Sequence, residues 1–174
     1  MANANPRSVD PLVVGKVIGD VLDMFVPVVE FTVDYGSKKI ANGVEITPSS
    51  AAQKPSVHIN GSPASPNLYT LIMVDPDAPS PSEPTFREWL HWYNDWREVV
   101  EYIGPSPPTG IHRYVLALFR QREAMQVPQK PPEGRGNFRT RQFAADNGLG
   151  LPVAALYFNS QKQSATNKKR RSAR

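Results

Sequence analysis

Two of the three histidines in this sequence stand in settings that could bind an anion. His91 lies in the segment REWLHW and His112 in GIHRY, while Asp75 and Asp77 supply carboxylates in MVDPDAP. A carboxylate close to an imidazole favours the protonated ring, so such a cluster could hold a phosphate while the aspartates orient the histidines. From the residues alone another interpretation stays open, in which the histidines are ordinary sheet residues and the aspartates cap turns. The third histidine, His58 in SVHIN, reads as a plain strand residue.

Strands are expected to position these side chains. Apolar or alternating runs bounded by Pro, Gly, Ser and Asn predict strands at 26–36, 56–60, 68–75, 89–93, 112–121 and 153–159. Asp75 ends one of them and His112 begins another, and side chains at strand ends often face a cleft.

Alternation along 89–93 predicts which side chains share the surface of His91. In WLHWY, Trp89, His91 and Tyr93 fall on one face, while Leu90 and Trp92 fall on the other.

Two short helices are expected beside the strands. The first covers 10–25, with Asp10 as N-cap, Pro11 at the first helical position, apolar residues at every fourth position and a break at Gly19. The second covers 138–150 and stops at an Asn-Gly pair.

Composition indicates one globular domain. The chain has 174 residues, of which 40% are hydrophobic and 21% charged, and we expect a single domain over 1–161. The absence of cysteine excludes disulfides and thiolate metal sites. No apolar leader or membrane-spanning run is visible, so cytoplasm and nucleus are the expected compartments.

The basic charge is concentrated at the C-terminus. The formal net charge is +4, but five of the 20 basic residues occupy the last seven positions, which leaves 15 against 16 acidic residues before them. We therefore expect residues 162–174 to form a disordered basic tail and predict no sequence-specific DNA binding by the domain. The run Lys168, Lys169, Arg170 and Arg171 is either a nuclear-targeting or phosphate-contacting partner segment or simply a solvated end.

Longer segments resemble a known family. DPDAPSPSEPTFREWLHW and GPSPPTGIHRY resemble the two signature segments of the phosphatidylethanolamine-binding-protein (PEBP) family, and the resemblance extends from Asp10 to Gln161. The strings LFRQ and LGLPVAA look like the plant branch that contains the Flowering Locus T, Terminal Flower and Mother-of-FT proteins. Within that branch, Trp89 and the segments PSEPTFREW and QKPP are typical of the Mother-of-FT proteins.

The resemblance implies a fold and a site. The fold is mainly β (β-rich α+β), with a central antiparallel sheet, a second smaller sheet and a few peripheral short helices. An anion pocket lies at one end and falls, position by position, on Asp75, Asp77, Trp89, His91, Pro105 and His112. Its expected ligand is a phosphate or a phospholipid headgroup, with no metal and no cofactor.

The resemblance also implies a role and partners. A monomeric, non-enzymatic scaffold is expected, which acts in seed germination, dormancy or flowering and co-regulates transcription through partner proteins such as 14-3-3 and bZIP proteins.

The sequence departs from the family between the two histidines. Only 112 − 91 = 21 positions separate them, because YNDWREVVEY at 93–102 replaces the usual Asp-Ile-Pro turn and Gly-rich loop. The positions of the 14-3-3 contact are also changed: Pro66 stands at the first, and either Ala124 or Arg122 stands at the last. We therefore expect weakened binding of 14-3-3 and bZIP partners.

A hydrolase, an inhibitor and a phospholipid carrier are the alternatives to a regulator. A hydrolase could use the histidines and aspartates as metal ligands or acid–base groups, but the chain has no HExxH, GxSxG, P-loop or Rossmann motif. A kinase or protease inhibitor and a phospholipid carrier, both known in the wider family, are the remaining alternatives.

Overall fold

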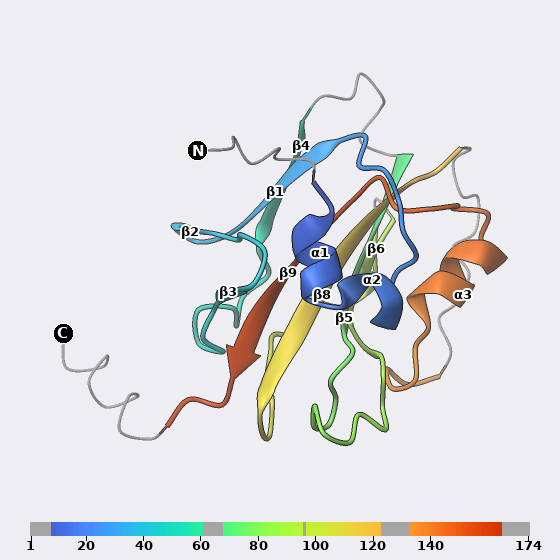
Figure 1. The fold of residues 1–174 in the computed structure, drawn as a ribbon. Coiled ribbons are helices and arrows are strands. Elements are labelled where there is room, and N and C mark those ends of the chain that lie inside the picture. Colours follow the sequence, from blue (N-terminus) through green and yellow to red (C-terminus); the bar gives the residue numbers. More distant parts are fainter. Residues whose placement is uncertain (1–7, 61–67, 96, 123–132, 165–174) are drawn as a thin grey trace.

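Two β-sheets and three short helices form the molecule, as the computed structural model shows for residues 8–60, 68–95, 97–122 and 133–164 (Figure 1). The smaller sheet covers one face of the larger sheet, and the helices cover the other face. The predicted β-rich architecture with a large and a small sheet is confirmed.

The six-stranded sheet has the order β3-β9-β8-β5-β6-β7. Its strands are β3 (Val44–Glu45), β5 (Tyr69–Asp75), β6 (Trp89–Asn94), β7 (Glu98–Val100), β8 (Ile111–Arg120) and β9 (Ala154–Gln161). Neighbouring strands are antiparallel except for β3 and β9, which run parallel. Because β5 runs opposite to β6 and β8, the end of β5 lies beside the starts of the other two, which brings the signature segments together.

The three-stranded sheet has the order β2-β1-β4. Its strands are β1 (Glu30–Tyr35), β2 (Lys38–Lys39) and β4 (Ser56–Asn60). Phe31, Val33 and Tyr35 of β1 alternate with more exposed residues and pack between the sheets against the buried side chains of β5, β8 and β9. This period-two pattern is what places the small sheet over the large one.

Helices pack on the opposite face of the large sheet. They are α1 (Asp10–Val14), α2 (Val17–Asp20) and α3 (Thr140–Asp146). Leu12, Val17 and Phe143 belong to an apolar cluster that includes Ile72, Val74, Leu90 and Val115 of the sheet. No helix among the described residues has the length and apolar character needed to cross a membrane.

The N-terminal helix differs from the prediction in two respects. Val9, not Asp10, is the N-cap of α1, and Asp10 is the first helical residue. The chain also breaks earlier than Gly19, at Gly15, which is the C-cap of α1. A Cβ at Gly15 would come within 2.4 Å of the hydroxyl oxygen of Tyr157, so the close packing of this ring requires a glycine here. Gly19 itself is non-helical, with φ of 115°, so a break there is confirmed.

The segment that is predicted to differ from the family pattern, at 93–102, begins with a hairpin. After β6 the chain turns and adds β7 as an edge strand, with Tyr93 opposite Val100 and Asn94 opposite Glu98. Strands β2, β3 and β7 were not predicted, because two or three residues are too few to show a period.

Candidate functional site

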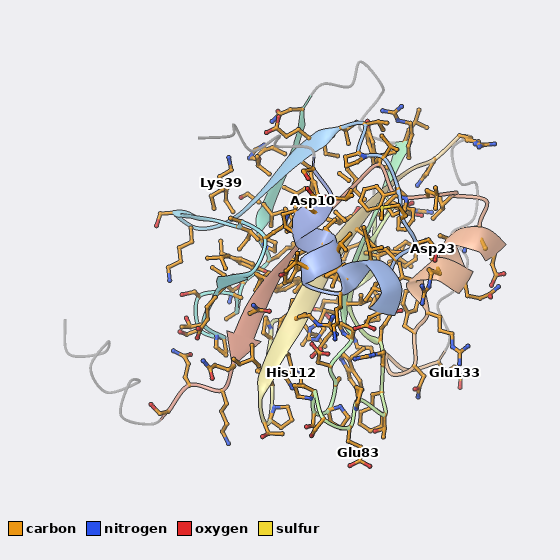
Figure 2. The ribbon with its side chains drawn as sticks, in the orientation of Figure 1. Asp10, Asp23, Lys39, Glu83, His112 and Glu133 are labelled. Atoms are coloured by element: carbon orange, nitrogen blue, oxygen red, sulfur yellow. The ribbon has the colours of Figure 1, made fainter. Side chains whose placement is uncertain are left out.

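A cavity of about 280 Å³ opens at the end of the large sheet where β5 ends and β6 and β8 begin. Its base holds Asp75, His91, His112 and Tyr114. Its walls are mainly apolar and include Pro79, Phe86, Trp89, Ile103, Pro107 and Pro108. Figure 2 shows His112 at the same end of the molecule as Glu83, in the loop between β5 and β6.

Asp75 and His112 form a buried pair in this base. Nδ1 of His112 lies 2.7 Å from Oδ2 of Asp75, and Nε2 donates to the carbonyl oxygen of Thr109 at 2.8 Å. Burial by itself lowers the pKa of His112, but the hydrogen bond to Asp75 and the charge of that carboxylate outweigh it, so the pKa lies above the ordinary value. Both ring nitrogens of His112 are therefore occupied, one by the carboxyl group of Asp75 and the other by a main-chain carbonyl oxygen.

His91 is in a different state. Its Nδ1 donates to the carbonyl oxygen of Ile103 at 2.7 Å, and the amide of Ile103 donates back to the carbonyl oxygen of His91 at 2.9 Å. Burial lowers the pKa of His91, and the hydrogen bond to Ile103 and the charge of Asp75 offset this only in part. The ring is therefore neutral, and Nε2 has no hydrogen-bond partner among the described residues.

A β-bulge determines which residues of β6 face the cavity. Met73 is opposite Trp92 and Val74 is opposite Leu90, so His91 is an extra residue without a partner on β5. Trp89 and His91 both line the cavity. The prediction for Tyr93 was wrong, because the bulge turns that ring to the helix side, where it packs against Phe143 at 5.1 Å.

Asp77 lies outside the lining of the cavity. Arg113 binds it through three N–H groups: the backbone amide and Nε each donate to Oδ2 at 2.9 Å, and Nη2 donates to Oδ1 at 2.7 Å. Arg113 follows His112 in β8, so its side chain faces the helix side and holds Asp77 there. Burial raises the pKa of Asp77, but the hydrogen bonds and charges of Arg113 and Arg87 prevail and lower it below the ordinary value.

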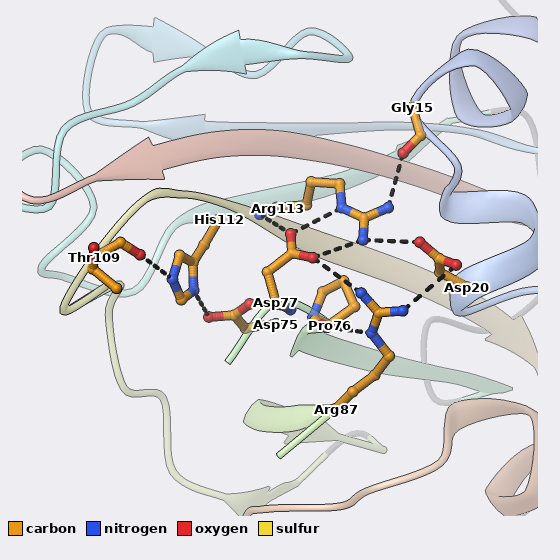
Figure 3. A network of polar contacts seen from close by, with 9 residues as sticks. All are labelled: Gly15, Asp20, Asp75, Pro76, Asp77, Arg87, Thr109, His112 and Arg113. Atoms are coloured by element: carbon orange, nitrogen blue, oxygen red, sulfur yellow. Dashed lines mark hydrogen bonds and ion pairs between the residues drawn. The ribbon is translucent and has the colours of Figure 1, made fainter. Parts of the chain in front are cut away.

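The network around Asp77 connects the loop to α2. Figure 3 shows the Asp77 carboxylate between Arg113 and Arg87, with Asp20 of α2 bridging the two guanidinium groups. Arg113 Nη2 lies 2.9 Å from Asp20 Oδ2, and Nη1 donates to the carbonyl oxygen of Gly15 at 2.9 Å. Two acids and two bases balance, so the network adds no net charge beside the cavity.

Sequence comparison identifies the family. The phosphatidylethanolamine-binding protein model matches residues 36–95 and 93–158. The chain belongs to the PEBP family. The two matched stretches meet at the end of β6.

Plant members of this family are similar over nearly the whole chain. Protein MOTHER of FT and TFL1 homolog 2 of Oryza sativa subsp. japonica is 49% identical, with 94% of this chain and 99% of the relative covered. TERMINAL FLOWER 1 of Arabidopsis thaliana is 42% identical (97% and 100% covered), and FLOWERING LOCUS T of the same plant is 45% identical (92% and 96% covered).

Solved structures of the family share the fold. A carboxypeptidase Y inhibitor, solved in complex with its cognate proteinase, is similar with a TM-score of 0.82 and 25% identity, covering 94% of this chain and all of the inhibitor. The phosphatidylethanolamine-binding protein from Plasmodium vivax has a TM-score of 0.75 at 21% identity, covering 91% and 99%.

Several predicted PEBP positions lie elsewhere or outside the described residues. Pro105 is buried but does not line the cavity, whereas its neighbours Ser106, Pro107 and Pro108 do. Pro66, Ala124 and the basic run Lys168, Lys169, Arg170 and Arg171 lie outside the described residues, and Arg122 is exposed.

Sequence reasoning missed three residues that organise the cavity and the strands around it. Tyr114 stacks on His112 and meets His91 edge-on at 5.1 Å. Arg135 donates to the carbonyl oxygens of Leu90 and His91, both at 3.1 Å, and of Glu101 at 2.8 Å, which fixes the chain below the cavity wall. The alternation of HRY in β8 could have indicated Tyr114, but Arg135 lies in a loop that carries no local signal.

The third missed residue, Glu88, joins β6 to α3. Its carboxylate is 5% exposed and accepts hydrogen bonds from the hydroxyl and the amide of Thr140. Burial raises the pKa of Glu88 to about 7, although the Thr140 hydrogen bonds and the charges of Arg141 and Arg87 act in the opposite direction.

The site lacks the arrangement of a hydrolase. Ser160 lies opposite His112 on β9, but it is fully buried, its hydroxyl has no hydrogen-bond partner in the structure, and it does not line the cavity. Among the described residues, no hydroxyl is bonded to His91 or His112, and no group of His, Asp and Glu side chains could hold a metal ion.

Proposed function

We propose that this chain is a non-enzymatic signalling regulator of the plant PEBP kind, closest in role to the Mother-of-FT proteins. The protein would regulate seed germination and dormancy or flowering, and it would act in the cytoplasm and the nucleus. Support comes from the names of its plant relatives and from Trp89, which lines the cavity at the position that resembles the Mother-of-FT branch.

The pocket is proposed to bind a phosphate or a phospholipid headgroup. One observation carries this: at the base of an apolar cavity, His91 offers a ring nitrogen without a partner beside a paired and neutralised Asp75 and His112. Such a site provides polar recognition at the base and apolar contact at the walls, which is the usual composition of a small-ligand pocket.

Ring signals of the histidines test this pocket directly. Inorganic phosphate or phosphoethanolamine is added to the full chain while the ring resonances of His91, His112 and His58 are followed by NMR. We expect His91 to shift and His58, on the small sheet, to stay in place. If His91 and His58 both stay unshifted up to millimolar ligand, the pocket assignment is wrong.

Regulation is proposed to pass through partner proteins. A 14-3-3 protein and a bZIP protein are the expected partners, and Pro66 together with the shortened connection after β6 is expected to weaken the complex. A pull-down with both partners is carried out with the full chain and with a chain that lacks residues 162–174. The comparison distinguishes partner binding by the domain from partner binding by the tail. Retention that depends on 162–174 assigns the contact to the tail, and no retention by either chain argues against this partnership.

Two alternatives have direct assays. Hydrolysis of a model ester that responds to zinc or to a chelator would identify an enzyme. The similarity to a carboxypeptidase Y inhibitor suggests measuring inhibition of that protease by the full chain. Absence of both activities is the expected result for a regulator.

A further inference from the structure

A second cavity, of about 320 Å³, lies beside β1 and β9 and shares no lining residue with the cavity that holds the histidines. Its floor is apolar and is formed by the buried side chains of Leu12, Val29, Ile40 and Leu156. Polar and charged residues of β1 and β2 line the rest of it. A volume of this size lies in the range of small-ligand sites, which combine an apolar lining with a few polar groups.

Main-chain hydrogen bonds close this second cavity at two ends. At one end, the amide of Val28 donates to the carbonyl oxygen of Val153 at 3.0 Å. At the other end, the amide of Gly43 donates to the carbonyl oxygen of Tyr157 at 3.1 Å. Between these ends, no hydrogen bond joins β1 to β9 in the described part of the chain. The cavity is therefore a gap between the edges of the two strands, beside α1 (Figure 1).

Strand β1 presents an unpaired peptide group along this gap. The carbonyl oxygen of Val33 accepts from the amide of Ile40 at 2.9 Å, on the edge of β1 that faces away from β4. Alternate residues of a strand direct their N–H and C=O groups to the same edge, so Phe31 directs its own groups to that side. Phe31 lines the cavity, and no described residue pairs with it on this edge.

Strand β9 presents a second unpaired peptide group. Tyr157 bonds on the edge that faces away from β8, where its carbonyl accepts from Gly43 and its amide donates to Oδ1 of Asn42 at 3.0 Å. By the same alternation, Ala155 directs its N–H and C=O to this edge, and it also lines the cavity. Because unpaired main-chain groups favour a hydrogen-bonding partner, a ligand with peptide groups suits the gap.

Opposite charges lie at the two ends of the gap. Glu30 begins β1 and Lys39 belongs to β2, and both are exposed and line the cavity. Figure 2 shows Lys39 on this side of the molecule. Lys39 is opposite Asp34, which is 34 − 30 = 4 residues from Glu30, or about 13 Å along the strand. Among the described residues, neither Glu30 nor Lys39 forms an ion pair.

We propose that this cavity binds short peptides with free termini, the ammonium group at Glu30 and the carboxylate at Lys39. An extended peptide of three residues is about 10 Å long, and the flexible side chains of Glu30 and Lys39 can reach its two ends. Its peptide groups pair with the main chain of Ala155 and Phe31, as in the addition of a strand to a sheet edge. A simple anion or cation would leave one of the two charges unmatched. The proposal does not depend on the function assigned to the histidine cavity.

Titration of the full chain with the tripeptide Ala-Leu-Ala, followed by NMR, tests the proposal. We expect the amide signals of Ala155 and Phe31 to shift, while the ring signals of His91 stay in place. The same peptide is used with an acetylated N-terminus, with an amidated C-terminus and with both caps. Each cap removes one ion pair at an exposed rim and should weaken binding by about twofold to fivefold. Methylation of the leucine nitrogen removes an N–H donor and should weaken binding by about fivefold.

Substitutions at the rim determine the direction of the peptide. In Lys39→Gln, the free and the amidated peptide should bind equally, while acetylation should still weaken binding. In Glu30→Gln the roles of the two caps should be exchanged. Lys38→Gln removes the neighbouring exposed lysine of β2, which does not line the cavity, and should leave the effects of both caps unchanged.

Three results would overturn the proposal. Absence of any shift at Ala155 with millimolar Ala-Leu-Ala means that the cavity is not a peptide site. Equal affinity for the free and the doubly capped peptide means that the site takes an uncharged ligand. Coupling of Lys39→Gln to acetylation instead of amidation reverses the assigned direction. The comparison of the four peptides uses the unmodified chain, so it holds even if a variant fails to fold.

Discussion

Glu88 is a buried carboxylate whose protonation should change the stability of the fold. The folded chain keeps the proton until a pKa of about 7, whereas the unfolded chain releases it near the ordinary glutamate pKa of 4.5. Between these values the folded state binds more protons, so the free energy of unfolding falls as the pH rises. The difference of about 2.5 in pKa corresponds to about 3 kcal/mol, at 1.36 kcal/mol for each pH unit.

Glu88→Gln should remove this dependence. The amide is neutral at every pH and can still accept from Thr140, so the variant gains stability relative to the wild type as the pH rises, by about 2–3 kcal/mol between about pH 5 and pH 8. Urea unfolding followed by tryptophan fluorescence measures both proteins. The quantity to follow is the difference in the free energy of unfolding between the variant and the wild type, as a function of pH. A constant cost of the substitution does not change with pH, and the titration of the other groups is the same in both proteins, so neither contributes to the change of this difference.

A matched control and a clear refutation are available. Glu83→Gln changes the same charge on the exposed loop before β6 and should leave the pH dependence as in the wild type. If the curves of wild type and Glu88→Gln stay parallel, to within about 1 kcal/mol over this range, Glu88 is not a proton-holding group of the folded state.

Three further substitutions address the site and its support. Asp75→Asn removes the carboxylate that raises the pKa of His112, so NMR titration should give a lower pKa for that ring; an unchanged value contradicts the ion pair. Arg113→Lys cannot reproduce the two-pronged contact with the Asp77 carboxylate, so urea unfolding should show a decrease of about 1–3 kcal/mol in the free energy of unfolding. Arg122→Lys, at an exposed position, is the control and should leave the free energy of unfolding nearly unchanged. Tyr102→Phe deletes the hydroxyl that donates to the carbonyl oxygen of Ala51 at 2.7 Å, and it should lower the free energy of unfolding by about 1–2 kcal/mol in the same measurement. An unchanged free energy of unfolding would mean that water replaces this contact.

Much of the fold could be predicted because its long strands carry local signals. The strand at 56–60 has the predicted bounds, and the apolar runs of β5, β8 and β9 were found to within two residues at each end. The second helix was shorter than predicted, since Thr140 starts it after an extended Arg139 and Asp146 ends it.

The residues that sequence reasoning misplaced depend on partner strands. Tyr93 turns away from the cavity because of a bulge that exists only against β5, and no pattern within WLHWY shows it. Asp77 was grouped with Asp75 by sequence proximity, but Arg113 on β8 binds it on the opposite face of the sheet. Both errors concern register and facing, which are set by contacts between segments far apart in the chain.

The connection after β6, which is predicted to be shorter than in the family, is held at both of its ends. Arg135 holds the carbonyls on either side of it, and the hydroxyl of Tyr102 is bonded to Tyr35 and to Ala51 on the other wall. Because these contacts hold both ends, the number of residues between about 94 and 101 can change without moving the walls of the cavity. The free energy of closing a loop also changes slowly with its length. Because no residue of β7 lines the cavity, we expect changes of length in this hairpin to alter the surface offered to other proteins more than they alter the cavity.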